Sequence, residues 1–176
     1  FACPVTIVAQ KIVCDLEADL PNWGAGGPDI TATTAQDFVT ASQGRCYFQP
    51  DWKFQWGPQS AYDPGDILVG PALAPWQSLP PTDGTGKTTV ALTPEQVSGS
   101  SYLWFREELQ NGYIPFTFDQ HGDTNADPVS AEMYCHIDVL NYDNYDRIDG
   151  IQPGQTYNCV GFNALAGPAS HTISGM

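Results

Sequence analysis

The segment spanning residues 81–113 most constrains the fold, because it alternates turn sequences with runs of β-forming residues. Asp-Gly-Thr-Gly at residues 83–86 and Asn-Gly at residues 111–112 are both typical of tight turns. Between them, β-branched and aromatic residues predict strands over residues 88–92 and 102–109. We therefore expect a β-meander in which these two strands pair, and not a catalytic loop.

Two charged residues are predicted to share strand faces with apolar side chains. Side chains alternate along a strand, so Glu107 lies on the same face as Leu103 and Phe105. In the predicted first strand, residues 5–13, the same alternation places Lys11 in a row of aliphatic side chains. We expect both charged groups to point toward a hydrophobic core.

The order of these features resembles the prealbumin-like B-type repeat domains of bacterial surface adhesins and pilins. The shared features are a Thr-Asp-Gly-x-Gly turn, a short strand, and Tyr-x-x-x-x-Glu before a Gly-Tyr pair. The resemblance implies an all-β, prealbumin-like or Ig-like β-sandwich with long loops and at most one short helix. It also implies a side-chain isopeptide bond between Lys11 of the first strand and Asn163 of the last, with Glu107 as the catalytic carboxyl.

The implied cross-link depends on burial, because an ammonium group is no nucleophile and an amide is a poor electrophile. Removal from water is expected to lower the pKa of Lys11 and to raise the pKa of Glu107. The neutral amine then attacks the Asn163 amide, while the protonated carboxyl polarises the carbonyl and ammonia leaves. The alternative is a buried Lys11–Glu107 ion pair without a covalent bond. Glu108 is a competitor for the catalytic role.

Five cysteines at wide, irregular spacings, without a C-x-x-C pair, favour disulfides over a zinc or iron–sulfur site. Our preferred pairing joins Cys14 to Cys46 and Cys135 to Cys159, because each bond then connects an expected strand to a neighbouring segment. The spacings alone leave other pairings open. Cys3 is left over, as an intermolecular disulfide partner or as a buried free thiol. Disulfides indicate an extracellular or cell-surface location.

The charge balance limits the partners of the chain. Six Lys and Arg residues against twenty Asp and Glu residues give a formal net charge of −14. Such a surface repels nucleic acid and anionic lipid headgroups, and no apolar run is long enough for membrane insertion. The chain begins with Phe1, so we take it as a processed or excised segment. Its length predicts one β-sandwich domain, residues 1–165, followed by a linker or docking arm, residues 166–176.

The remaining elements are one helix, several strands and a long loop. Residues 31–42 contain the only plausible helix, with Thr33 or Thr34 as its N-terminal cap. Further strands are predicted over residues 45–56, 114–118, 130–139 and 156–165, and a loop over residues 57–81. Aromatic rings alternate with polar residues at Trp52, Phe54 and Trp56, which favours a core position over a sugar-binding platform.

Residues 119–127 form an acidic run whose oxygen atoms suit calcium. Asp119, Asp123, Asn125 and Asp127 lie around a glycine, and calcium prefers carboxylate and amide oxygens. The run lacks the terminal glutamate of an EF-hand, and it also suits a solvated acidic turn. Calcium is therefore an optional ligand, and the implied cross-link requires no cofactor.

These features predict a structural or adhesive module of a cell-surface protein or an extracellular filament. Its partners are expected to be neighbouring subunits or other domains of a surface assembly, or a host or environmental protein or glycan. The alternative is a carbohydrate-binding β-sandwich that stacks sugars on Trp23 and Trp76, which lie in loops rich in proline and glycine. No metalloprotease, nucleophile-elbow or phosphate-binding motif is present, so we expect self-cross-linking and no enzymatic turnover.

Overall fold

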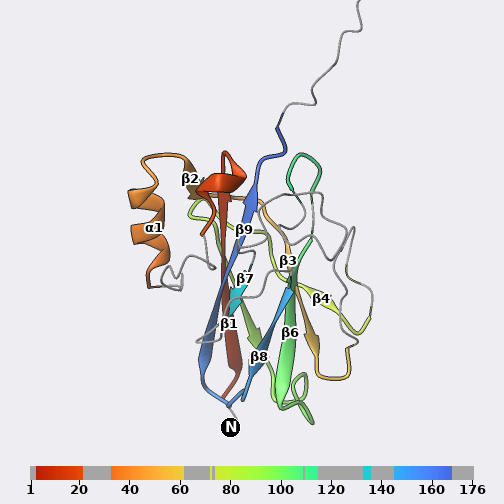
Figure 1. Ribbon diagram of the computed structural model, residues 1–176. Helices are drawn as coiled ribbons and strands as arrows, with labels where there is room; N and C mark the ends of the chain where they lie inside the picture. The colour runs from red at the N-terminus through yellow and green to blue at the C-terminus, as the bar shows by residue number, and fades with distance from the viewer. Residues whose placement is uncertain are drawn as a thin grey trace, which may run out of the picture.

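The protein is an all-β sandwich of two packed sheets with long connections (Figure 1), as the sequence predicts. The computed structural model describes residues 3–21, 33–61, 72, 74–108, 110–114, 133–135 and 145–167. Within these ranges the elements follow one another as β1 (Val5–Cys14), the 3-10 helix η1 (Glu17–Asp19), α1 (Ala35–Ala41), β2 (Cys46–Phe48), β3 (Phe54–Pro58), β4 (Gln77–Ser78), β5 (Lys87–Leu92), β6 (Tyr102–Glu107), β7 (Met133–Cys135), β8 (Tyr145–Asp149) and β9 (Thr156–Ala164).

The five-stranded sheet has the first and last strands at its centre. Its order is β2-β1-β9-β7, and β5 pairs with the first half of β1, beyond the residues that pair with β2. The strands β1 and β9 run parallel, with Lys11 opposite Gly161 and Val13 opposite Asn163. Strands β2 and β5 on one side and β9 on the other form hydrogen bonds with the backbone of β1. The inward side chains of β1 lie between the two sheets.

The four-stranded sheet has the order β4-β3-β6-β8, and all its pairs are antiparallel. Phe54 of β3 lies opposite Glu107 of β6 in this register. The two residues therefore share one face of the sheet, and that face looks toward β1 and β9.

The predicted β-meander is wrong, although both of its strands exist. β5 belongs to the five-stranded sheet, where it pairs with β1, and β6 belongs to the four-stranded sheet. Residues 93–101 connect them through turns, with Gln96 N–H donating to Thr93 O and Ser100 N–H donating to Val97 O. This connection exceeds the roughly two to five residues of a hairpin loop, so it does not force the strands to pair.

The single strand predicted over residues 45–56 is also wrong, because the chain crosses between sheets within it. β2 lies in one sheet and β3 in the other. Pro50 lacks an amide hydrogen, and Asp51 adopts a left-handed φ of 59° while its N–H donates to Thr82 O. The strand β8 was not predicted, because its first residues follow a run of Asn and Asp that is typical of turns.

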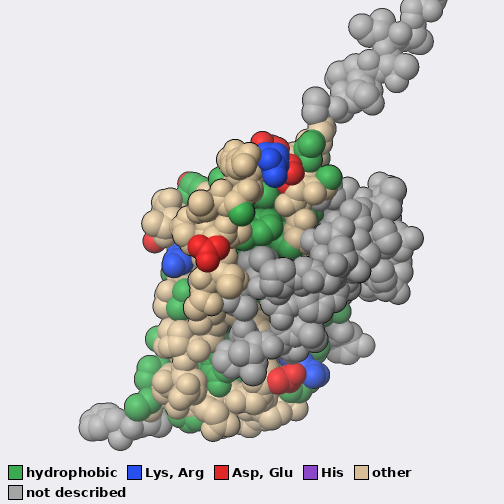
Figure 2. Space-filling model, turned by 60° about the vertical axis from the view of Figure 1, so that its left-hand side comes forward, with side chains coloured by type: hydrophobic (Ala, Val, Ile, Leu, Met, Phe, Trp, Pro, Cys, Tyr) green, Lys and Arg blue, Asp and Glu red, His purple; other side chains and the backbone are tan. Residues whose placement is uncertain are grey.

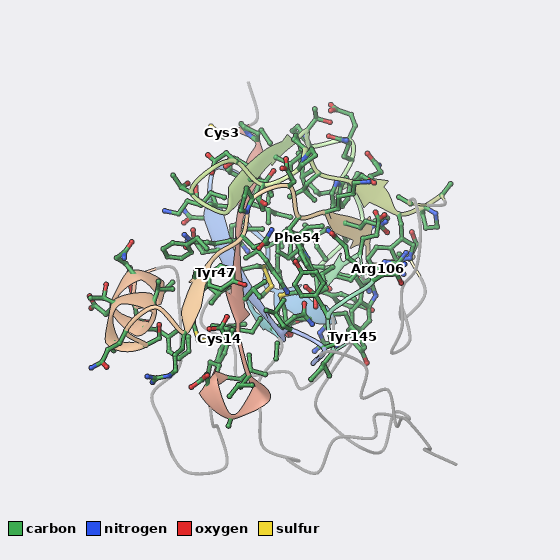
Figure 3. All side chains as sticks on the ribbon, turned by 90° about the horizontal axis from the view of Figure 1, so that it is seen from above. Cys3, Cys14, Tyr47, Phe54, Arg106 and Tyr145 are labelled. Atoms are coloured by element: carbon green, nitrogen blue, oxygen red, sulfur yellow. A yellow bond between two sulfur atoms is a disulfide. The ribbon has the colours of Figure 1, made fainter. Side chains whose placement is uncertain are left out.

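The main core lies between the sheets, and a second cluster lies outside the five-stranded sheet. Trp52, Phe54 and Trp56 are buried in the main core, as their alternation predicts. Figure 3 shows Phe54 between the two sheets. On the outer side, α1 covers β9, with the ring of Phe38 packed edge-on against Phe162 at a centroid distance of 5.5 Å. The described part of the chain has no other α-helix.

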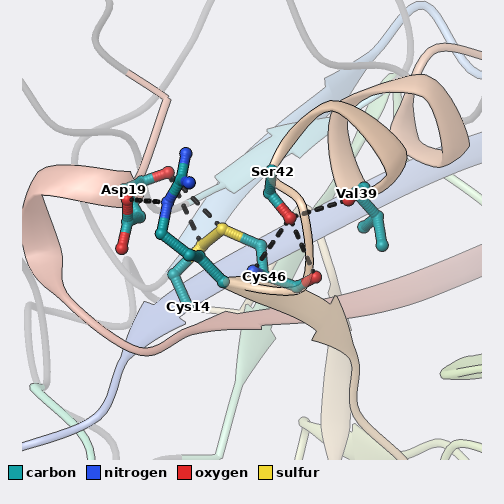
Figure 4. Close-up of a disulfide and its surroundings, with 6 residues drawn as sticks. Cys14, Asp19, Val39, Ser42 and Cys46 are labelled. Carbon is teal, nitrogen blue, oxygen red and sulfur yellow. Dashed lines mark hydrogen bonds and ion pairs between the residues drawn. A yellow bond between two sulfur atoms is a disulfide. The ribbon is translucent and has the colours of Figure 1, made fainter.

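Two disulfides have the predicted pairing. Cys14 and Cys46 join β1 to β2, and Cys135 and Cys159 join β7 to β9. Ser42, after α1, supports the first bond: its Oγ accepts from Cys46 N–H at 3.0 Å, and its hydroxyl donates to Val39 O at 2.7 Å (Figure 4).

Several charged side chains at the surface lie in pairs of opposite charge. Figure 2 shows a face on which the basic side chains of the described residues lie beside acidic ones. Examples are Arg45 Nε, 2.7 Å from Asp19 Oδ1, and Arg147 Nε, 2.9 Å from Asp149 Oδ1. None of the described helices combines the length and the hydropathy that a bilayer crossing requires.

Candidate functional site

The site begins with Lys11, whose entire side chain is buried between the two sheets. It is among the largest side chains with no exposed surface, and it follows Val5, Ile7 and Ala9 on the inward face of β1. The turn at residues 83–86 helps to hold this position, because Lys11 N–H donates to Gly86 O at 2.9 Å. Gly86 has a φ of +71°, and an added Cβ would lie 2.9 Å from Lys11 O, so glycine is required there.

The fold brings Glu107 and Asn163 to the end of the Lys11 side chain. Asn163 comes from β9, the parallel neighbour of β1, and Glu107 comes from β6 in the opposite sheet. All three side chains have 0% exposure. Residues separated by 96 and 152 positions from Lys11 are thus placed in one enclosed cluster, which we call the Lys–Glu–Asn cluster.

The polar atoms of the Lys–Glu–Asn cluster contact one another directly. Lys11 Nζ donates to Glu107 Oε2 and to Asn163 Oδ1. Asn163 Nδ2 donates to the backbone carbonyl of Ile114 at 2.8 Å, which orients the amide. The amine is therefore held between a carboxyl group and an amide, the two groups that an isopeptide reaction needs.

Burial controls the electrostatics of the cluster. It raises the pKa of Glu107 above its ordinary value, and Lys11, Trp52 and Asn163 lower it by a smaller amount. Burial therefore favours the protonated, uncharged form of the Glu107 carboxyl group, because the charged form has lost its hydration.

Glu108, the competitor for the catalytic role, lies away from the cluster, and so do two exposed lysines. Glu108 is partly exposed and lies 4.0 Å from the ammonium of Lys53, whose side chain is 53% exposed. Lys87 is exposed at the start of β5. Glu107 is therefore the carboxyl group that faces Lys11, and the geometry gives Glu108 no access to it.

Sequence reasoning missed two residues that shape the cluster. Trp52 was predicted only as core, but its Nε1 donates to Glu107 Oε2 at 3.0 Å and its ring centroid lies 4.2 Å from Lys11 Nζ. Gly161 lies opposite Lys11, and a Cβ there would be 3.2 Å from Phe54 Cε1. Alternation along a strand indicates the face on which a side chain lies, but it does not indicate a hydrogen-bond partner. The sequence therefore did not show that the indole of Trp52 donates to Glu107.

The prediction that Trp76 is exposed is wrong. Its exposure is 9%, and the guanidinium carbon of Arg106 lies 3.7 Å from its ring centroid. Arg106 Nε and Nη2 donate to Gln55 Oε1 at 3.1 and 2.9 Å on the outer side of the four-stranded sheet. Burial lowers the pKa of Arg106 to about 10. The indole is therefore too deeply buried to offer an open platform for a sugar.

Several predicted ligands lie outside the described residues. These are Trp23 and the acidic-run residues Asp119, Asp123, Asn125 and Asp127. Within the described ranges, no group of three His, Cys, Asp or Glu residues is arranged to hold a metal ion. Cys3 is an exposed free thiol, so the alternative of a buried free cysteine is wrong.

Comparison of the chain with protein-family models, with curated proteins and with solved structures found no match. The class of the protein therefore follows from its own fold and site. It is a disulfide-bonded all-β sandwich with a fully buried lysine, glutamate and asparagine between its sheets.

Proposed function

We propose that the chain is a structural or adhesive module of a cell-surface protein or extracellular filament, stabilised by an autocatalytic isopeptide bond between Lys11 and Asn163. The observation that carries this proposal is the fully buried Lys–Glu–Asn cluster, which links the first and last strands. The bond resembles the one that the prealbumin-like B-type domains form, and Glu107 has the role of the catalytic carboxyl.

The proposed reaction exchanges one C–N bond for another. Lys11 Nζ, as a neutral amine, attacks Asn163 Cγ and forms a new amide bond. The Cγ–Nδ2 bond breaks, one proton moves from Nζ to Nδ2, and Nδ2 leaves as ammonia. Glu107 relays this proton and returns to its starting state, so no cofactor is consumed. The cluster holds the groups at high effective molarity, which compensates for the weak electrophile.

The position of the bond suits a protein that carries load. The chain enters β1 at one end of the sandwich and leaves β9 at the opposite end (Figure 1), and the two strands are parallel neighbours. A pull on the two ends would shear β1 against β9, and a covalent bond between Lys11 and Asn163 would transmit that force directly. The rest of the sandwich would then remain folded under tension.

The disulfides and the net charge of −14 support an extracellular location, where such a module would meet neighbouring subunits or domains. The exposed Cys3, at the end where the chain enters β1, is the proposed intermolecular disulfide partner. Light scattering with and without reductant tests this arrangement, and a protein that is monomeric in both conditions contradicts it.

The test of the cross-link is an intact mass of the reduced and alkylated chain. We expect the mass to be lower than that of the sequence by one ammonia, and peptide mapping to join Lys11 to Asn163. Lys11→Ala should restore the full mass, whereas Lys53→Ala, which removes an exposed lysine, should keep the deficit. An unshifted mass in the unmodified chain refutes the cross-link and leaves a buried ion pair.

A second candidate function, carbohydrate binding, is favoured by the outer side of the four-stranded sheet. Tyr102, Trp104 and Tyr145 form a row of half-buried rings there, with centroid separations of 5.5 and 6.0 Å. The guanidinium of Arg147 lies 4.9 Å from the Tyr102 ring. Rings and polar groups in one row suit a sugar. Glycan-array binding that Trp104→Ala abolishes, and that Tyr47→Ala on the other sheet preserves, would establish this function; no binding by the unmodified chain refutes it.

A further inference from the structure

Trp52 contacts Lys11 and Glu107 of the Lys–Glu–Asn cluster, and the proposed reaction assigns no role to Trp52. We infer that Trp52 is a positioning residue for the cross-linking reaction, and that its indole N–H makes Oε1 of Glu107 the oxygen that carries the catalytic proton. This inference rests on the proposed function, because it assigns roles within the same reaction.

The two oxygens of Glu107 have unequal surroundings. Oε2 accepts from Trp52 Nε1 at 3.0 Å and also contacts Lys11 Nζ. Oε1 is buried and accepts no hydrogen bond from the described residues. The Asn163 side chain lies close enough to the carboxyl group to lower its pKa, although Oε1 has no hydrogen-bond partner among the described residues. The carboxyl group therefore has one oxygen that accepts from two donors and one that, within the described ranges, accepts from none.

This asymmetry decides where a proton resides on the neutral carboxyl. A carboxylic acid has one hydroxyl oxygen and one carbonyl oxygen, and the carbonyl oxygen is the better acceptor. Two N–H groups aimed at Oε2 favour Oε2 as the carbonyl oxygen, so the proton is placed on Oε1. Without the indole N–H, Oε2 would face the amine alone, and the proton could reside on either oxygen.

The assignment completes the proton relay of the proposed reaction. As Lys11 Nζ forms its bond to Asn163 Cγ, Oε2 accepts the proton that Nζ loses. Oε1 donates its proton to Nδ2, and the Cγ–Nδ2 bond breaks with loss of ammonia. One proton enters Glu107 and one leaves it, so the carboxyl is neutral before and after the step. No oxidant or reductant is needed.

The surroundings of Trp52 hold its indole in place. Its N–H backbone group donates to Thr82 Oγ1 at 2.8 Å, and its carbonyl accepts from Thr82 N–H at 2.9 Å. The ring of Tyr113 packs edge-on against the indole at a centroid distance of 4.8 Å. The indole has 0% exposure and precedes β3, so these contacts, rather than pairing within the sheet, fix its direction.

The test compares two variants at position 52 that lack the indole N–H with a control variant at position 56. The control removes the same side-chain volume from the same core as Trp52→Phe. Trp52→Phe removes the donor, and a benzothienylalanine at position 52 replaces the N–H by sulfur while keeping the shape of the side chain. Trp56→Phe is the matched control, because Trp56 is 1% exposed in the same core. Each full-length chain is obtained unfolded and unreacted, kept reduced in denaturant, then refolded in a glutathione buffer and sampled over time for the loss of ammonia by intact mass.

We expect both changes at position 52 to slow the ammonia loss by about ten- to a hundredfold, since one hydrogen bond to an ionisable group is lost. Trp56→Phe should react within about twofold of the unmodified rate. Equal rates for the unmodified and benzothienyl chains overturn the role of Trp52 and leave the cross-link intact. An unmodified chain that keeps its full mass overturns the proposed function and this inference together.

The pH profile separates a positioning role from a structural one. Lys11 is the titratable group that faces Glu107 from β1, and the neutral groups of Trp52 and Asn163 come from the segment before β3 and from β9. The indole N–H lowers the pKa of Glu107, and the reaction needs the protonated carboxyl, so loss of the indole N–H should move the alkaline limb of the rate profile to higher pH. A slower reaction with an unmoved profile would assign Trp52 a packing role only and overturn the inference.

Discussion

Replacing Lys11 while Glu107 stays in place measures how much a buried, charged carboxyl group lowers the free energy of unfolding. In Lys11→Met, Glu107 keeps the hydrogen bond from Trp52 but loses its main cationic neighbour. The double variant Lys11→Met with Glu107→Gln retains an oxygen that accepts from Trp52 and carries no charge. Neither variant can form the isopeptide bond, so their difference in stability reports the charge of Glu107 alone.

The structure determines the sign and the upper limit of the stability difference between the single and the double variant. Burial raises the pKa of Glu107 above its ordinary value of 4.5, and the loss of Lys11 removes a cause that lowers it. The folded state then holds its proton more tightly than the unfolded state. Stability is fully present below about pH 4.5 and falls as the pH rises through the folded pKa, by about 1.4 kcal/mol per unit. At pH 7 the penalty is at most about 3.5 kcal/mol.

The assay is urea unfolding of both variants between pH 4.5 and pH 8, followed by tryptophan fluorescence. We expect Lys11→Met to approach the stability of the double variant near pH 4.5 and to become steadily less stable than the double variant as the pH rises toward 7. A gap at pH 7 below about 1 kcal/mol, or one that does not change with pH, would refute the argument. Such a result would mean that water reaches Glu107 in the folded protein.

Three further changes have defined outcomes in thermal unfolding. Gly161→Ala should cost about 1–3 kcal/mol, because its Cβ would lie 3.2 Å from the Phe54 ring, whereas Gly167→Ala, which meets nothing within 4 Å, should be neutral. Arg106→Lys should cost about 1 kcal/mol and red-shift the emission of Trp76, since it removes the guanidinium that covers the ring. Replacement of both cysteines of the β7–β9 disulfide by alanine should cost about 3 kcal/mol, and an unchanged Tm would contradict a bond that closes this loop.

Local pattern predicted β1, β5, β6 and β9 and the directions of their side chains, but it missed β8 and the crossing between β2 and β3. The period of two placed Lys11 on the inward face of β1 and Glu107 on that of β6, and both are buried. The alternation of Trp52, Phe54 and Trp56 indicated the core. These predictions succeed because the direction of a side chain along a strand depends on parity, which the sequence contains directly.

Pairing between strands could not be predicted in the same way. The segment from β5 to β6 suggested a meander, yet β5 pairs with β1, which lies about 80 residues earlier in the chain. Which strands meet depends on the total area that the two sheets bury, and no local pattern reports that quantity.

The sequence by itself determined the β-rich character of this chain, the inward parity of Lys11 and Glu107, and the cysteines available for disulfides. Only the tertiary structure decided that Asn163, Glu107 and the indole nitrogen of Trp52 converge on one amine, and that Trp76 lies beneath an arginine. The physical reason is the range of the interactions. Turn and strand preferences act over a few residues, whereas the desolvation that raises the pKa of Glu107 exists only after two sheets have excluded water.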